Sequence, residues 1–222
     1  MSFKINAISF ILFAENITDA IIHPAILQNL NIIPAEWELA ERPAIDELRT
    51  QLVFTNQVSL TLQTDCIIFQ ENTEQQQLEN LQIPAIVLAY WQTFHQLQYR
   101  SLCIVPQSEL AFDSATAIAS YLTNNLLASN FWQDFDAQNS TFISLQFVYP
   151  YKSGSFRLEI EYDALTSAEN FNWKVDFVGT FDYRLVGNNN NESITYFNSL
   201  ISQWQVDVNR FTNHLQQYFS PD

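Results

Sequence analysis

The 222-residue sequence contains only three glycines, Gly154, Gly179 and Gly187. Phosphate-binding loops and dinucleotide-binding fingerprints require several glycines in close register, so the common nucleotide-binding folds are excluded. The chain also lacks a Gly-x-Ser-x-Gly segment and a His-Glu-x-x-His segment, which are the signatures of two large hydrolase classes. We therefore predict no catalytic residue and no cofactor, and the sequence favours a protein that is not an enzyme.

Basic residues are also scarce. The chain has nine Lys and Arg residues and 24 Asp and Glu residues, which gives a formal net charge of −15. Binding to a phosphate backbone depends on Lys and Arg side chains that displace counterions, so no nucleic-acid partner is expected. An acidic chain of this kind is better suited to a protein partner.

Cysteine and histidine are too few and too dispersed for a metal site. Cys66 and Cys103 lie in separate apolar runs without Cys-x-x-Cys spacing, and His23, His95 and His214 are far apart in the sequence. We expect two buried free thiols, as in a protein of the reducing cytoplasm. No apolar run approaches the roughly 18 residues that a membrane-spanning helix needs, so no membrane partner is predicted.

The residues that are abundant indicate a folded, globular chain. Hydrophobic residues make up 47% and aromatic residues 14% of the sequence, and 20 Asn and 20 Gln supply much of its polarity. This composition excludes a disordered or low-complexity chain, and the length suits a single compact domain over residues 1–222.

The C-terminal half contains the clearest strand patterns. Apolar and polar residues alternate over residues 156–162 and 173–185, which indicates two half-buried strands that pair as a hairpin. A third strand at 143–149 ends at Pro150 and is joined to the first of these by a tight turn at 151–154. The sequence therefore predicts an antiparallel meander of at least three strands.

A long helix follows the meander. Its apolar residues recur every three or four positions: Ile194, Phe197, Ile201, Trp204, Val208, Phe211, Leu215 and Tyr218. This spacing predicts one helix of about seven turns with a single apolar stripe. The stripe fits the apolar face of the preceding meander, as in two-layer proteins, and the alternative is a seam between two chains that would form a homodimer.

The first half has a similar but weaker order of elements. An apolar alternation at Ile8, Phe10 and Leu12 indicates a strand, and strands at 58–62 and 66–69 precede a helix at 83–97. Further expectations are a strand at 100–105 that ends at Pro106, a helix at 114–128 and a short helix that begins at Pro43. The predicted fold class is α+β, with antiparallel meander sheets packed by long helices. Two similar strand-then-helix halves, 1–106 and 113–222, would fit this order.

One region has charge of only one sign. Residues 50–99 contain no Lys or Arg, while Asp65, Glu71, Glu74 and Glu79 are present. We interpret these four carboxylates as a candidate acidic interaction surface, because complementary charge selects and accelerates the encounter with a basic partner.

These observations lead to three hypotheses about function. The first is a non-catalytic protein-interaction module, such as an adaptor, an inhibitor, or an immunity or chaperone-like factor. The second is a carrier that holds a small apolar ligand in a cavity between the C-terminal helix and the sheet, lined by Trp173, Phe177, Phe181, Tyr183 and Trp204. The third is an enzyme of unrecognised type.

Overall fold

The computed structural model describes residues 3–15, 17, 19–46, 49–73, 77–126, 142–163, 173–185 and 191–220. The strands in these ranges are β1 (Lys4–Glu15), β2 (Ala44–Ile45), β3 (Arg49–Val53), β4 (Val58–Gln63), β5 (Cys66–Asn72), β6 (Gln98–Phe112), β7 (Phe142–Tyr151), β8 (Gly154–Asp163) and β9 (Trp173–Arg184). The α-helices are α1 (Pro24–Asn29), α2 (Ile83–Thr93), α3 (Ala115–Tyr121), α6 (Asn191–Ser202) and α7 (Trp204–Phe219). Short helical turns are η1 (Asp19–Ile22), η2 (Leu78–Asn80) and η3 (Leu122–Leu126).

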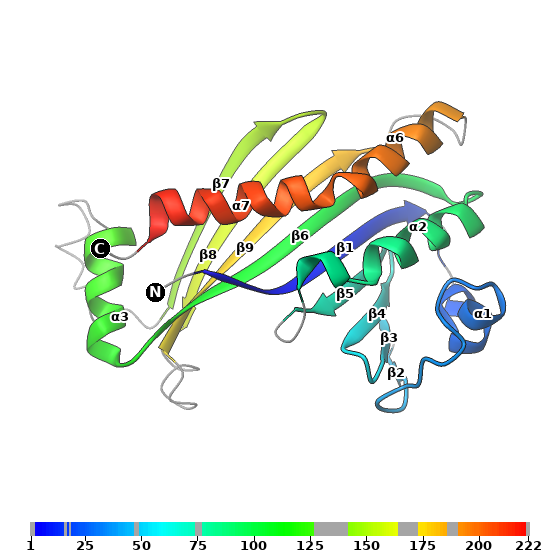
Figure 1. Ribbon diagram of the computed structural model, residues 1–222, viewed down its shortest axis with the longest axis horizontal. Coiled ribbons are helices and arrows are strands. Elements are labelled where there is room, and N and C mark those ends of the chain that lie inside the picture. Colours follow the sequence, from blue (N-terminus) through cyan, green and yellow to red (C-terminus); the bar gives the residue numbers. More distant parts are fainter. Residues whose placement is uncertain are drawn as a thin grey trace.

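The nine strands form one antiparallel sheet in the order β2-β3-β4-β5-β1-β6-β9-β8-β7 (Figure 1). The α+β class and the antiparallel sheet predicted from the sequence are confirmed. The long strands β1 and β6 pair with each other in the middle of the sheet, and β2 and β7 are the two edge strands.

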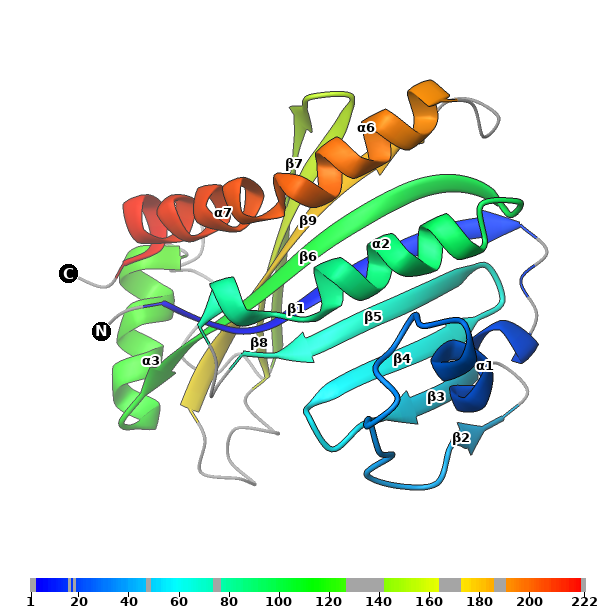
Figure 2. The same ribbon diagram turned by 45° about the vertical axis from the view of Figure 1, so that its right-hand side comes forward.

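The described helices lie on one face of this sheet. Figure 2 shows α2, α6 and α7 along the same side, with α1 in front of β3 and β4. The alternation of side chains in a strand explains the choice of face, since Ile8, Phe10 and Leu12 of β1 all point to the helices and are fully buried. The opposite face carries no described helix, and its side chains are mostly partly exposed.

The helix α7 contacts the sheet through aromatic residues. Trp204 packs edge-on against Phe10 with a centroid distance of 6.2 Å. At Gly179 of β9, an added Cβ would lie 2.6 Å from the Phe211 ring, so the glycine permits the close approach of α7. The predicted stripe therefore lies in the core of the same chain from Phe197 to Leu215, whereas Tyr218 at its end is 59% exposed.

The single C-terminal helix predicted from the sequence is wrong in one respect. The structure has two helices, α6 and α7, which are separated at Gln203 (φ −108°, ψ 8°). Just before the break, Ser199 and Ser202 donate side-chain hydrogen bonds to the carbonyl oxygens of Tyr196 and Ser199. Such local bonds compete with regular helix geometry, and a break lets the stripe follow a twisted sheet.

Three expectations about proline are also wrong. The strand predicted to end at Pro150 continues to Tyr151, because Pro150 occupies a position of this edge strand that does not bond to β8. The strand predicted to end at Pro106 continues to Phe112, so residues 107–112 lie inside β6 rather than in a connection. Pro106 is tolerated because the β6–β9 ladder is interrupted beside it, between the pairs Ile104↔Phe181 and Gln107↔Val178. Pro43 starts no helix, because the residues after it form the short edge strand β2.

Other sequence predictions are confirmed. The strands β7, β8 and β9 form a meander, and a turn at Lys152 and Ser153 joins β7 to β8. The helix predicted from residue 114 is present as α3 and η3, and Ser114 caps it by accepting a hydrogen bond from the Ala117 N–H. Cys66 and Cys103 are free and buried. Among the helices that the structure describes, none is both long and apolar enough to cross a membrane.

Candidate functional site

A shallow groove of about 590 Å³ lies on the sheet face that has no described helix. It crosses the strands from β1 to β7, and its lining is mainly polar: Phe13, Asp65, Arg100, Ser101, Cys103, Gln146, Val148, Ser155, Arg157, Thr180 and Asp182.

Both arginines of this groove have partners of opposite sign. Arg100 lies 3.3 Å from Asp65, and the Arg157 Nε lies 3.6 Å from a Glu159 carboxylate oxygen. These pairs are largely exposed and contribute little to stability. The groove is thus polar without a concentrated charge of either sign.

Cys103 lies in the groove as an unreactive thiol. Its Sγ donates a hydrogen bond of 3.6 Å to an Asp182 carboxylate oxygen. Burial, with a further contribution from the Asp182 charge, raises the pKa of Cys103 to about 12. The thiolate is the nucleophilic form of cysteine, so this group does not act as a nucleophile near neutral pH.

Among the described residues, exposed large hydrophobic side chains are concentrated on the edge strand β7. Phe142 is 58% exposed, Phe147 39%, Val148 62% and Tyr149 41%. These four are half of the eight large hydrophobic residues that are exposed in the described ranges, the others being Leu30, Ile45, Val206 and Tyr218. We refer to Phe142, Phe147, Val148 and Tyr149 as the β7 surface.

The backbone of β7 has polar groups that point away from the sheet. The two-residue turn makes Tyr151 and Gly154 a hydrogen-bonded pair. Because hydrogen-bonded and non-hydrogen-bonded pairs alternate, the odd-numbered residues of β7 bond to β8. The N–H and C=O groups of Phe142, Ser144, Gln146 and Val148 point outward, where no described strand pairs with them.

A second hollow of about 590 Å³ lies on the helix side of β7, along the outer face of α7. Its lining includes Tyr151 of β7 and Arg210, His214 and Tyr218 of α7. The Tyr149 ring lies 6.1 Å from the His214 ring, and His214 lies 4.8 Å from Tyr218. This second hollow thus meets β7 only at its last residue, Tyr151, and otherwise follows α7.

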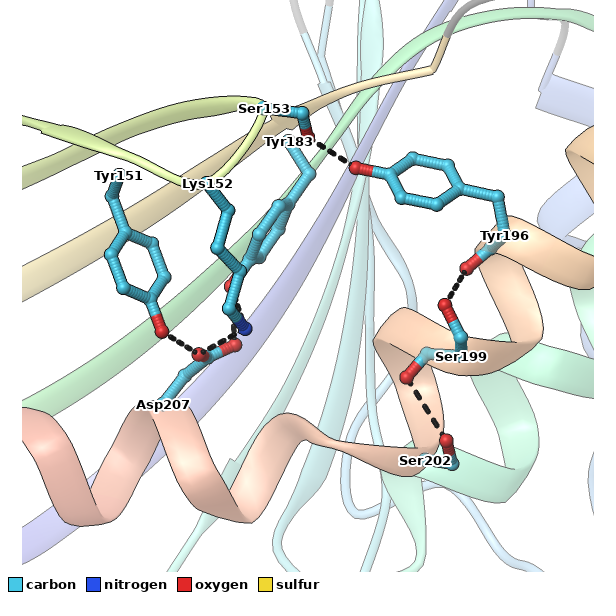
Figure 3. Close-up of polar contacts among 8 residues, drawn as sticks. All are labelled: Tyr151, Lys152, Ser153, Tyr183, Tyr196, Ser199, Ser202 and Asp207. Atoms are coloured by element: carbon cyan, nitrogen blue, oxygen red, sulfur yellow. Dashed lines mark hydrogen bonds and ion pairs between the residues drawn. The ribbon is translucent and has the colours of Figure 1, made fainter.

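A buried polar cluster attaches the β7–β8 turn to α7 (Figure 3). Asp207 is 1% exposed and accepts hydrogen bonds from the Tyr151 hydroxyl at 2.8 Å and the Tyr183 hydroxyl at 2.6 Å. Lys152 Nζ completes the cluster, at 3.1 Å from Asp207 and 3.3 Å from the Tyr183 hydroxyl. A buried carboxylate requires such partners, and here one side chain of α7 connects to two strands and their turn.

The chemistry of this cluster is that of a structural contact. Burial lowers the pKa of Lys152, but hydrogen bonds and charge from Asp207 and Tyr151 raise it by more, so the net pKa lies above 10.5. Burial and the Asp207 carboxylate also raise the pKa of Tyr183. Near neutral pH the lysine is therefore protonated and the phenol is neutral, so neither serves as a base.

The same turn is connected to α6 as well. Lys152 has a φ of 48°, a left-handed conformation that directs the chain back into β8. The next residue, Ser153, is hydrogen-bonded through its hydroxyl to the Tyr196 hydroxyl of α6 (Figure 3). The two C-terminal helices thus position the β7–β8 hairpin from both sides of their break.

The predicted acidic surface is not assembled as one patch. Glu71 is fully buried, and its carboxylate accepts hydrogen bonds from the Gln82 and Ile83 N–H groups at the start of α2. That part of the prediction is wrong, because Glu71 faces the helix side of β5. Asp65 and Glu79 are exposed but lie beyond opposite ends of β5, and Glu74 falls outside the described residues.

The predicted ligand-binding residues lie within the core. Phe177, Phe181 and Tyr183 are fully buried, Trp204 is 7% exposed and Trp173 is partly buried. Four of them are distributed along β9, which at about 3.3 Å per residue separates Trp173 from Tyr183 by about 33 Å. The rings also contact other rings, for example Phe181 with Phe156 at 4.6 Å. These contacts give no support to a ligand carrier.

The sequence interpretation missed two groups, the Asp207 cluster and the β7 surface. Asp207 was detectable as an acidic residue within an apolar stripe, three positions after Trp204. The β7 surface was detectable as ten residues without a charge, FISLQFVYPY. Among the described residues, no group of three or more His, Cys, Asp or Glu is placed to hold a metal ion.

Comparison with known proteins adds no assignment. No protein-family model matches this chain, and no curated protein matches its sequence.

Proposed function

We propose that this protein is a non-catalytic protein-interaction module that binds an apolar segment of a basic partner protein at the β7 surface. The observation that carries the proposal is the concentration of exposed large hydrophobic side chains on one edge strand. Phe142 and Val148 lie on the groove side of the sheet, and Phe147 and Tyr149 lie on the helix side, so a segment along this edge would contact apolar groups on both faces. An uncharged edge strand is also a site of association with other chains.

The charge of the chain supports a basic partner. The net charge is −15, and the strand itself carries no charged residue. Long-range attraction would then select a basic protein, while the contact itself would bury apolar groups.

The anchoring of the hairpin supports a preformed site. Asp207 of α7 and Tyr196 of α6 bind the turn that follows β7, through the contacts of Figure 3. A strand held in this way loses little conformational freedom on binding, which favours affinity.

A peptide-binding measurement tests the proposal. The probe is a fluorescein-labelled peptide of about ten residues, the length of β7, in which valine and tyrosine alternate with threonine and lysines stand at both ends. The matched peptide has glutamates in place of the lysines. We expect saturable binding of the lysine peptide by fluorescence polarisation, about tenfold tighter than that of the glutamate peptide at low salt, with the difference decreasing as salt is added.

Variants locate the binding surface. The double variant Phe147→Ser, Val148→Ser removes two exposed apolar groups of β7, and we expect it to weaken binding by about tenfold or more. The control is Ile45→Ser on the other edge strand, where the side chain is 72% exposed. Absence of saturable binding to the wild type, or an equal loss in the control, would contradict the proposal.

We further propose that the chain consists of two similar halves. The order β3-β4-β5-β1 on one side of the sheet is matched by β7-β8-β9-β6 on the other, with α2 following the first set and α6 and α7 the second. This repetition supports an internal duplication whose second unit begins at β6, at Gln98 rather than at residue 113, since the boundary expected between 106 and 113 would divide this strand. A cytoplasmic location is likewise our proposal, supported by the two free buried thiols.

A further inference from the structure

The geometry points to strand addition as the mode of binding: the partner segment extends the sheet as a tenth strand along the outer edge of β7. This inference rests on the proposed function and specifies how the same surface recognises its partner. Its basis is the backbone of β7 rather than the apolar side chains alone.

The first argument is the set of outward backbone groups. Phe142, Ser144, Gln146 and Val148 direct their N–H and C=O groups away from β8, as the turn geometry requires. These groups repeat every second residue, which is the spacing that another extended chain presents. An extended peptide can therefore form a ladder with β7 through main-chain hydrogen bonds.

The second argument is Pro150. It also occupies an outward position but has no N–H to donate, so the ladder must end before it. Pro150 is an example of proline at an outward position of an edge strand, where it leaves the pairing with β8 intact. The binding edge is thus limited to residues 142–148.

The third argument is the position of the groove and of the exposed apolar side chains of β7. Side chains of an added strand alternate between the faces of the sheet. Those on the helix side would lie beside Phe147 and Tyr149, and those on the other side beside Gln146 and Val148 at the groove. A partner segment with apolar residues at alternate positions would therefore contact apolar side chains of β7 on both faces.

The experiment compares Gln146→Pro with Gln146→Ala. Both substitutions remove the glutamine side chain, but only proline removes the outward N–H and places a ring at the edge. With the lysine-flanked peptide as probe, we expect Gln146→Pro to weaken binding by about tenfold or more and Gln146→Ala by less than about threefold. Circular dichroism and thermal unfolding verify that the proline variant remains folded.

A second series places the change on the peptide. N-methylation of one peptide bond at a time removes one N–H of the probe and leaves its side chains in place. Strand addition predicts sensitivity at every second position only, since alternate N–H groups face β7. This series tests the inference even if Gln146→Pro fails to fold.

The outcomes separate this inference from the proposed function. Suppose that binding weakens in the Phe147→Ser, Val148→Ser variant but shows neither the effect of Gln146→Pro nor the two-residue period of the N-methylated peptides. This result would overturn strand addition and would still support the β7 surface as the binding site. Absence of peptide binding would overturn both. Pairing of β7 with a second copy instead, seen as a wild-type dimer in analytical ultracentrifugation that the peptide does not dissociate, would also overturn the inference.

Discussion

Replacement of Asp207 by alanine tests whether the buried cluster fixes the β7–β8 hairpin to α7. The change leaves the hydroxyl groups of Tyr151 and Tyr183 without their acceptor and Lys152 without its ion-pair partner. Each buried hydroxyl that loses its acceptor costs about 1–1.5 kcal/mol. The lysine side chain is 37% exposed and can be hydrated when its ion-pair partner is removed, so the loss of the ion pair costs roughly 1 kcal/mol of stability.

The expected loss in the free energy of unfolding is therefore about 3–4 kcal/mol. In a chain of 222 residues this corresponds to a decrease in Tm of about 10 °C. Urea unfolding followed by circular dichroism measures it. The control is Asp176→Ala, which removes an exposed partner of Lys174 and should cost less than about 1 kcal/mol.

A double-mutant cycle refines the test. In a background that carries Tyr151→Phe and Tyr183→Phe, the hydroxyls are already absent, so Asp207→Ala should cost only about 1–2 kcal/mol. A loss of less than 1 kcal/mol in the wild-type background, or the same loss in both backgrounds, would refute the cluster as the attachment of the hairpin.

Three further substitutions test other contacts. Glu71→Ala should lower the free energy of unfolding by about 1–2 kcal/mol because it removes the acceptor at the start of α2, whereas Glu79→Ala should change it by less than about 0.5 kcal/mol in the same urea titration. Gly179→Ala should cost about 1–3 kcal/mol by calorimetry, because its methyl group would overlap the Phe211 ring. Burial raises the pKa of Cys103 from 9.0 to about 12, so the unfolded chain releases this proton first and stability falls as pH rises above about 9. When pH rises from about 8 to about 10, the free energy of unfolding of the Cys103→Ala variant should therefore decrease by about 1.4 kcal/mol less than that of the wild type. Equal decreases in the two proteins would disprove this assignment.

The elements that the sequence predicted well are those in which pattern and packing agree. Residues 156–162 alternate because one face of β8 meets the helices, and the same reason applies to Ile8, Phe10 and Leu12 of β1. The apolar stripe from Phe197 to Leu215 was detectable for the same reason, since every member contacts the core.

The errors arose where distant contacts override local preference. A proline normally ends a strand, but Pro106 lies in β6 because the neighbouring ladder is interrupted beside it. The break at Gln203 had no proline or glycine to indicate it, because it depends on serine side chains and on the twist of the sheet below.

The candidate site was the least predictable part. The exposure of Val148 depends on β7 being at the edge, and strand order is a property of the whole fold. The sequence prediction placed Glu71 at the surface because an isolated carboxylate is usually exposed. Only the folded structure brings this carboxylate to the amide groups at the start of α2. Pro150 was the available signal for an edge, since proline is favoured in edge strands and is tolerated inside a sheet only where the ladder is irregular, as at Pro106.

The most direct test of the β7 surface is amide hydrogen exchange, followed by NMR, with and without the lysine-flanked peptide. In the free protein we predict fast exchange at Ser144, Gln146 and Val148, whose N–H groups point outward, and slow exchange at Phe147 and Tyr149, which bond to β8. Addition of peptide should slow exchange at the three outward amides and leave the other two unchanged. If these three amides exchange equally fast with saturating peptide, the edge of β7 does not bind it.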